Sequence, residues 1–138
     1  MGIDQQPLDE GLQALYEAAR AAAARAYVPY SGFRVGAALR GRDGTITTGC
    51  NVENASFGLT ICAERVACMA AIAQGHGDFD AIAIHVDADD GQPCGACRQV
   101  LSEFAPDMLV LYRMQGVVRA RPLRELLPDG FEPAALNT

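Results

Sequence analysis

Three cysteines are the residues of this sequence best suited to chemistry. Cys94 and Cys97 are three residues apart, so on a helix that begins near Pro93 their sulfurs lie on one face and can reach one metal ion. That pair alone would also fit a redox motif, but Cys62, at the start of a second helical pattern, offers a third thiolate. Three protein ligands leave the fourth position of a tetrahedral zinc ion open, which is typical of a catalytic site.

The residues after Cys62 could supply an acid–base group and a positive charge. Three thiolates around a dication make a net anionic site, so we expect helix N-termini at Cys62 and Cys94, together with the guanidinium of Arg65, to stabilise them. Glu64 is the candidate for moving protons to and from a water molecule. Residues two apart on a helix point to different sides, however, so the spacing alone does not direct Glu64 toward the metal.

Four stretches of the sequence resemble the small zinc-dependent cytidine deaminases. They are residues 30–39 (YSGFRVGAAL), 49–54 (GCNVEN), 61–65 (ICAER) and 93–100 (PCGACRQV), and the resemblance extends from about residue 27 to residue 131. It implies one Zn²⁺ per chain, held by Cys62, Cys94 and Cys97, with Glu64 as the catalytic proton carrier. The implied reaction is the hydrolysis of cytidine and 2′-deoxycytidine to uridine and 2′-deoxyuridine with release of ammonia, a step of pyrimidine salvage.

The same resemblance implies the contacts to the nucleoside. Asn51 and Glu53 match the residues that bind the ribose hydroxyls, and Phe33 matches the aromatic residue that packs on the nucleoside. The backbone at Ala63 would contact the base, and Phe131 would reach into the site of a neighbouring subunit of a homotetramer. At position 57 this sequence has Phe where many relatives have Tyr.

Each of these assignments has a simpler alternative. The cysteines could hold a structural zinc or be buried thiols, and the carboxylate of Glu64 could serve only the dipole of its helix. Phe33 alternates with apolar residues and could lie on the core face of a strand, and Arg65 could be a solvated charge. For the whole protein, the alternatives are a blasticidin S deaminase, which shares the cysteine and glutamate motifs, and a zinc-binding module without activity.

The composition favours one compact enzyme domain over residues 1–138. Half of the 138 residues are hydrophobic, and no linker or low-complexity segment divides the chain. The net charge of −6 argues against a nucleic-acid partner, and no apolar run is long enough to cross a membrane. Cys50 and Cys68 have no partner at ligand spacing and are expected to be buried, without disulfides, which favours a cytoplasmic location.

Periodicity predicts an α/β fold in three layers, α-β-α, around a mixed five-stranded sheet, as in cytidine deaminases. Helical patterns cover residues 8–26, 62–74, 94–104 and, briefly, 122–127. Alternating or β-branched patterns cover residues 33–39, 45–51, 79–86, 108–114 and 117–120. The helix at 62–74 is apolar on nearly all sides, which indicates layers on both faces of the sheet or a subunit interface.

Overall fold

A five-stranded sheet forms the middle layer of the protein. The computed structural model describes residues 8–136. Its strands are β1 (Val35–Gly41), β2 (Ile46–Cys50), β3 (Phe79–Val86), β4 (Leu109–Met114) and β5 (Val117–Pro122). The order is β2-β1-β3-β4-β5, in which only β3 and β4 run parallel, so the sheet is mixed as predicted.

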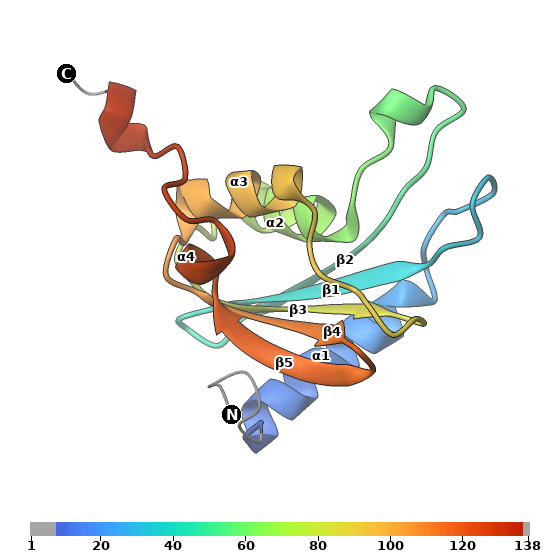
Figure 1. Ribbon diagram of the computed structural model, residues 1–138, viewed down its shortest axis with the longest axis horizontal. Helices are drawn as coiled ribbons and strands as arrows, with labels where there is room; N and C mark the ends of the chain where they lie inside the picture. Colours follow the sequence, from blue (N-terminus) through green and yellow to red (C-terminus); the bar gives the residue numbers. More distant parts are fainter. Residues whose placement is uncertain (1–7, 137–138) are drawn as a thin grey trace.

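Helices cover both faces of this sheet (Figure 1), which confirms the predicted three-layer architecture. Helix α1 (Glu10–Ala23) packs on one face, and helices α2 (Ala63–Ala73) and α3 (Gly95–Phe104) lie on the other. Neighbouring residues of a strand serve opposite cores: Ile82 and Ile84 belong to the α2–α3 side, whereas Ala83 belongs to the α1 side. Short helices complete the chain: η2 (Phe57–Leu59), α4 (Leu123–Leu126) and η3 (Pro133–Leu136).

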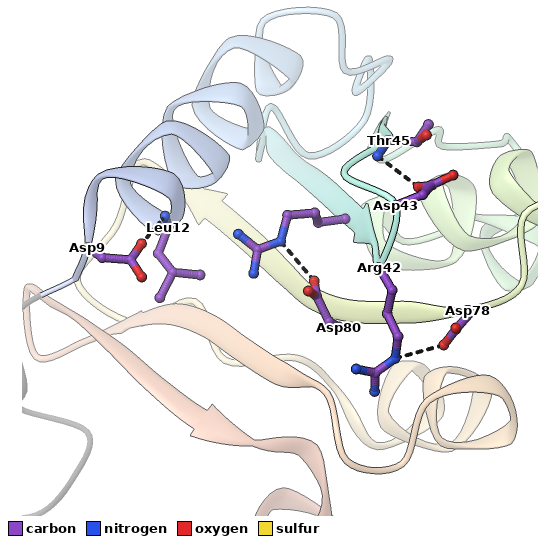
Figure 2. Close-up of polar contacts among 8 residues, drawn as sticks. Asp9, Leu12, Arg42, Asp43, Thr45, Asp78 and Asp80 are labelled. Carbon is purple, nitrogen blue, oxygen red and sulfur yellow. Dashed lines mark hydrogen bonds and ion pairs between the residues drawn. The ribbon is translucent and has the colours of Figure 1, made fainter.

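Helix α1 is shorter than the predicted span of residues 8–26 because side chains end it at both termini. Asp9 caps the start, where its carboxylate accepts a hydrogen bond from the backbone N–H of Leu12 at 2.8 Å (Figure 2). At the other end, Arg34 donates to the carbonyls of Ala24 and Ala26 at 3.2 and 2.8 Å. Arg34 therefore ties the segment before β1 to the end of α1.

The β1–β2 hairpin forms as expected, but its first strand starts later than predicted. Strand β1 begins at Val35, so residues 33 and 34 lie outside the sheet. At the turn, the Asp43 carboxylate accepts a hydrogen bond from Thr45 N–H, and Arg42 pairs with Asp78 at 2.9 Å (Figure 2). The remaining predicted helices and strands agree with the structure to within two residues at each end.

Gly36 allows α1 to approach β1 closely. A Cβ atom at this position would lie 2.0 Å from the carbonyl oxygen of Ala19 and 2.5 Å from the backbone nitrogen of Ala23. We therefore expect Gly36→Ala to lower the free energy of unfolding by about 3 kcal/mol, because backbone atoms must move apart. Urea denaturation measures this change. Gly58→Ala is the control, since a Cβ there meets nothing within 4 Å; equal stability of both variants would contradict the close approach.

Among residues 8–136, no helix is both long and apolar enough to span a membrane.

Candidate metal and catalytic site

The three cysteines singled out in the sequence converge at the starts of two helices. Cys62 is the N-cap of α2, Cys94 is the N-cap of α3, and Cys97 is the third residue of α3. Their sulfur atoms all lie within 4.8 Å of one another, so they form a group that can hold a metal ion. Zinc bound at about 2.3 Å from each sulfur requires sulfur–sulfur distances of about 4 Å, and soft thiolates suit zinc. The residues present therefore fit a zinc ion.

The surroundings of Cys62 favour its thiolate form. Hydrogen bonding from the Cys97 thiol, assisted by Arg65, lowers the pKa of Cys62 to about 5. Arg65 lies about one helical turn after Cys62, and its guanidinium donates from Nη2 to Cys62 Sγ at 3.3 Å. Cys94 Sγ lies 3.5 Å from Cys97 Sγ. The site thus combines two helix N-termini with one guanidinium, the two sources of positive potential that three thiolates require.

Glu64 is buried beside this cluster, with 4% of its surface exposed. Burial raises the pKa of its carboxyl group, and the negative charge of Cys62 acts in the same direction. The side chain lines a cavity of about 530 Å³ whose wall also includes Cys62 and Cys94. A buried carboxyl with a raised pKa facing a cavity has the properties of a group that exchanges protons with a bound molecule.

Three of the predicted nucleoside contacts, Phe33, Asn51 and Ala63, also line this cavity. Phe33 is half exposed, at 49%, and is therefore not a core residue of a strand. Asn51 is buried, and its amide group accepts from Val35 N–H at 3.0 Å and donates to the Phe33 carbonyl at 2.8 Å. Asn51 thus fixes the backbone on which the exposed ring of Phe33 is carried.

Glu53 and Phe131 lie outside the cavity wall. The Glu53 carboxylate accepts hydrogen bonds from the N–H groups of Tyr30 and Ser31, at 3.0 and 3.1 Å, and from the Ser31 hydroxyl. The Ser31 hydroxyl and these N–H groups hold the pKa of Glu53 below its usual value. Phe131 is 60% exposed, and its carbonyl accepts from Gln99 Nε2 at 2.9 Å. Within one chain, neither residue therefore lines the cavity beside the cysteines.

Sequence reasoning missed most of the rest of the cavity wall. The additional lining residues are Val35, Thr60, Ile84, Val86, Asp90, Gly91, Gln92 and Pro93. Alternation along β3 could have indicated Ile84 and Val86, since both belong to the face that packs against α2 and α3. The residues just before Pro93 could have been predicted to line the site, because they lead directly into the metal-ligating motif.

A second cavity, of about 610 Å³, contains none of the predicted site residues. It is lined by residues of α3 and of the C-terminal segment, among them Ser102, Arg124 and Asp129. Arg124 is already paired with Asp107 at 2.7 Å and with Glu132 at 3.1 Å. Although this cavity is the larger one, Arg124 is the one cationic side chain among its described lining residues, and it is already paired with carboxylates. We therefore assign the chemistry to the cavity beside the cysteines.

Cys50 and Cys68 take no part in the metal cluster. Cys50 is half-buried at the end of β2, and Cys68 is buried in the core on the α2 side. Within the described part of the chain, all five cysteines are free thiols.

Comparison with known proteins shows similarity to zinc-binding deaminases. The family model described as "Cytidine and deoxycytidylate deaminase zinc-binding region" matches residues 9–113. A cytidine deaminase from Halalkalibacterium halodurans is 47% identical over 81% of this chain and 87% of its own. The crystal structure of a cytidine deaminase from Burkholderia pseudomallei superposes with a TM-score of 0.83 at 50% identity, covering 90% of this chain and 100% of that one. A blasticidin-S deaminase from Bacillus cereus is less similar, at 36% identity over 68% of this chain and 74% of its own.

Proposed function

Because the chain belongs to the family of zinc-binding cytidine and deoxycytidylate deaminases, we propose that it hydrolyses cytidine and 2′-deoxycytidine to uridine and 2′-deoxyuridine with release of ammonia. The observation that carries this proposal is the position of Glu64, a buried carboxyl in the same cavity wall as Cys62 and Cys94. A purely structural zinc site needs no such neighbour.

Glu64 carries the protons in this reaction. A zinc ion held by Cys62, Cys94 and Cys97 supplies the positive charge that lowers the pKa of water toward neutrality. Glu64 takes one proton from the attacking water and gives it to N3 of the base while the new C4–O bond forms. It then passes the second proton of the water to the 4-amino group, the C4–N bond breaks and ammonia leaves. Burial of Glu64 favours this role because it raises the pKa of the carboxyl toward the working pH.

The nucleoside is held by groups in and around the cavity wall. We assign the base to the Phe33 ring and the backbone at Ala63, and the ribose to Asn51 and Glu53. The hydrogen bonds that Glu53 accepts from Tyr30 and Ser31 support a second role for it, which is to hold the loop that precedes Phe33. Loss of Glu53 would then affect the sugar side of the site both directly and through this loop.

Glu53→Ala should lower kcat/KM for cytidine by about tenfold or more. The change removes a charge-assisted hydrogen bond to the ribose and the contacts of Glu53 with the loop before Phe33. The activity on free cytosine, which has no sugar, should change less. Steady-state kinetics on both substrates measures the ratio. Glu53→Gln keeps an acceptor and serves as the control; equal losses on cytidine and cytosine would contradict a contact with the ribose.

The chain, a single domain over residues 1–138, is proposed to assemble into a homotetramer in which neighbouring subunits complete each site. Exposed apolar side chains support this assembly. They lie on two segments that project beyond the sheet, one before β1 and the other around η2 (Figure 1). These side chains belong to Tyr27, Tyr30, Phe33, Val52, Phe57, Leu59 and Ile61. Phe57, where many relatives have Tyr, contacts the Tyr30 ring edge-on at 5.7 Å between centroids.

Phe131→Ala tests whether a neighbour completes the site. Its side chain is 60% exposed in one chain, so its removal should leave the fold intact and reduce kcat/KM for cytidine by about tenfold, as for an aromatic anchor lost from an interface. Light scattering after gel filtration gives the assembly size of both proteins. Unchanged kinetics in a tetramer would show that Phe131 plays no part in the site.

A cytoplasmic location and a role in pyrimidine salvage complete the proposal. The free cysteines support the first, since thiols persist in reducing compartments. The second follows from the proposed reaction, which recovers uridine and 2′-deoxyuridine.

Ammonia release from four compounds tests the proposed function against its alternatives. Purified protein should act rapidly on cytidine and 2′-deoxycytidine and much more slowly on cytosine, and it should leave blasticidin S nearly unchanged. Turnover of blasticidin S alone would establish the rival deaminase activity instead. A folded protein that binds zinc but acts on none of the four compounds would be a zinc-binding module without this activity.

A further inference from the structure

A chain of hydrogen bonds on the α1 side of the sheet links three residues that the proposed reaction does not use. The Tyr16 hydroxyl lies 2.9 Å from His85 Nδ1, and His85 Nε2 lies 2.8 Å from Asp87 Oδ1. The two rings meet edge-on, with 5.5 Å between their centroids. Tyr16 and His85 are buried, at 5% and 2% exposure, so this contact belongs to the packing between α1 and β3.

The partners define a direction for these hydrogen bonds. The Asp87 carboxylate can only accept, so Nε2 of His85 donates to it. In the neutral imidazole, Nδ1 then accepts from the Tyr16 hydroxyl, and each polar group of the buried pair has a partner. Burial of an imidazole between a helix and a sheet is therefore compensated by two hydrogen bonds, one to each side.

This series of hydrogen bonds ends at Asp87, close in sequence to residues that line the active-site cavity. Ile84 and Val86, on either side of His85 in β3, line the cavity from the opposite face of the sheet. Asp87 is the first residue after β3, and the connection that follows it supplies residues 90–94 of the cavity wall, including the ligand Cys94. The hydrogen bond between His85 and Asp87 therefore holds the first residue of that connection.

The rest of the connection is anchored to the β4–β5 hairpin. Gly91 N–H donates to the Arg113 carbonyl at 2.9 Å, and the Asp90 carboxylate accepts from Gln115 N–H at 2.9 Å. Gly116 N–H donates to the Asp89 carbonyl at 3.0 Å. At the start of the connection, the His85–Asp87 hydrogen bond adds a link to β3 and, through Tyr16, to α1.

We propose that His85 and Asp87 are positioning residues, which hold segment 88–93, and with it the cavity-lining residues 90–93, in place from behind the sheet. Asp87 does not line the cavity, and 83% of its side chain is exposed, so it acts through the backbone that follows it. Tyr16 extends the same chain to α1, and thereby couples the helix on one face to the binding wall on the other.

Asp87→Ala removes the hydrogen bond without disturbing the core. Hydrogen–deuterium exchange of segment 88–93 should become about 3- to 10-fold faster, the range expected for one lost hydrogen bond. In the same variant, KM for cytidine should rise by about 3- to 10-fold while kcat and zinc per chain stay within about twofold of the unmodified protein. Asp87→Asn keeps an oxygen acceptor and should restore both values.

Asp80→Ala is the matched control. Asp80 lies near the start of β3, about 23 Å before Asp87, and accepts from Arg40 Nε at 2.8 Å (Figure 2). Its replacement removes a comparable contact at the end of β3 away from Asp87, so it should leave both exchange of segment 88–93 and KM unchanged. Tyr16→Phe should act in the direction of Asp87→Ala, and the effects of the two changes should not add fully.

Unchanged exchange of segment 88–93 in Asp87→Ala would overturn this role, as would an Asp80→Ala variant that matches it in both measurements. Failure of Asp87→Asn to restore either value would also overturn it, because a hydrogen-bond acceptor would then not be what matters. The kinetic part rests on the proposed function, whereas exchange does not. An unmodified protein without cytidine turnover would refute the proposed function, and the exchange comparison would still decide the role of Asp87.

Discussion

Glu64→Gln is expected to bind zinc normally and to lose about 10²-fold or more in kcat for cytidine deamination. Glutamine has nearly the same shape as glutamate but cannot carry the two protons that leave the water for N3 and for the departing amine. Burial raises the pKa of this carboxyl, which means that its surroundings disfavour the charged form. A neutral amide should therefore not lower the thermal stability of the protein.

Steady-state kinetics, zinc content and a melting curve on one preparation test this expectation. Glu103→Gln is a suitable control because it makes the same change on an exposed part of α3. A Glu64→Gln protein that turns over cytidine at a normal rate would show that another group moves the protons. A protein that loses zinc as well would instead make Glu64 necessary for the metal site.

Cys94→Ala is expected to reduce zinc from about one ion per chain to nearly none after dialysis, and to abolish the activity. Two thiolates remain, but the third ligand is gone. The fold should survive, because Cys94 is exposed and its side chain makes no hydrogen bond that caps α3. Circular dichroism should therefore show unchanged helix content in a protein without metal.

Cys50→Ala provides the comparison for the loss of a cysteine. Cys50 is half-buried at the end of β2 and does not belong to the metal cluster, so its removal should leave both zinc content and turnover unchanged. Retention of one zinc per chain by Cys94→Ala, or its loss from Cys50→Ala, would mean that the three ligands are wrongly assigned.

The metal cluster could be predicted from the sequence because its geometry is largely local. Cys94 and Cys97 occupy the N-cap and the third position of one helix, where a three-residue spacing brings side chains together. The orientation of Glu64 could not be predicted in this way. Cys62 has an extended backbone, with φ −69° and ψ 151°, and stands outside α2 as its N-cap. The rule for residues two apart within a helix therefore does not apply to this pair.

The features that the sequence did not reveal depend on contacts between distant residues. Phe33 looks like a strand residue by alternation, but the amide of Asn51 binds the backbone at Phe33 and Val35, and the strand starts only at Val35. The pairing of Tyr16 with His85 joins residues 69 positions apart and leaves no periodic signal. Local propensity cannot anticipate such contacts, because the tertiary structure creates them.

Stepwise return of zinc to chelated protein tests the central claim most directly. The rate of cytidine deamination and the zinc per chain are measured on the same samples. We predict a rate that rises in proportion to bound zinc and levels off at about one ion per chain, while Glu64→Gln takes up the same zinc and stays inactive. Full activity without zinc, or no activity at one zinc per chain in the unmodified protein, would contradict a deaminase built on Cys62, Cys94, Cys97 and Glu64.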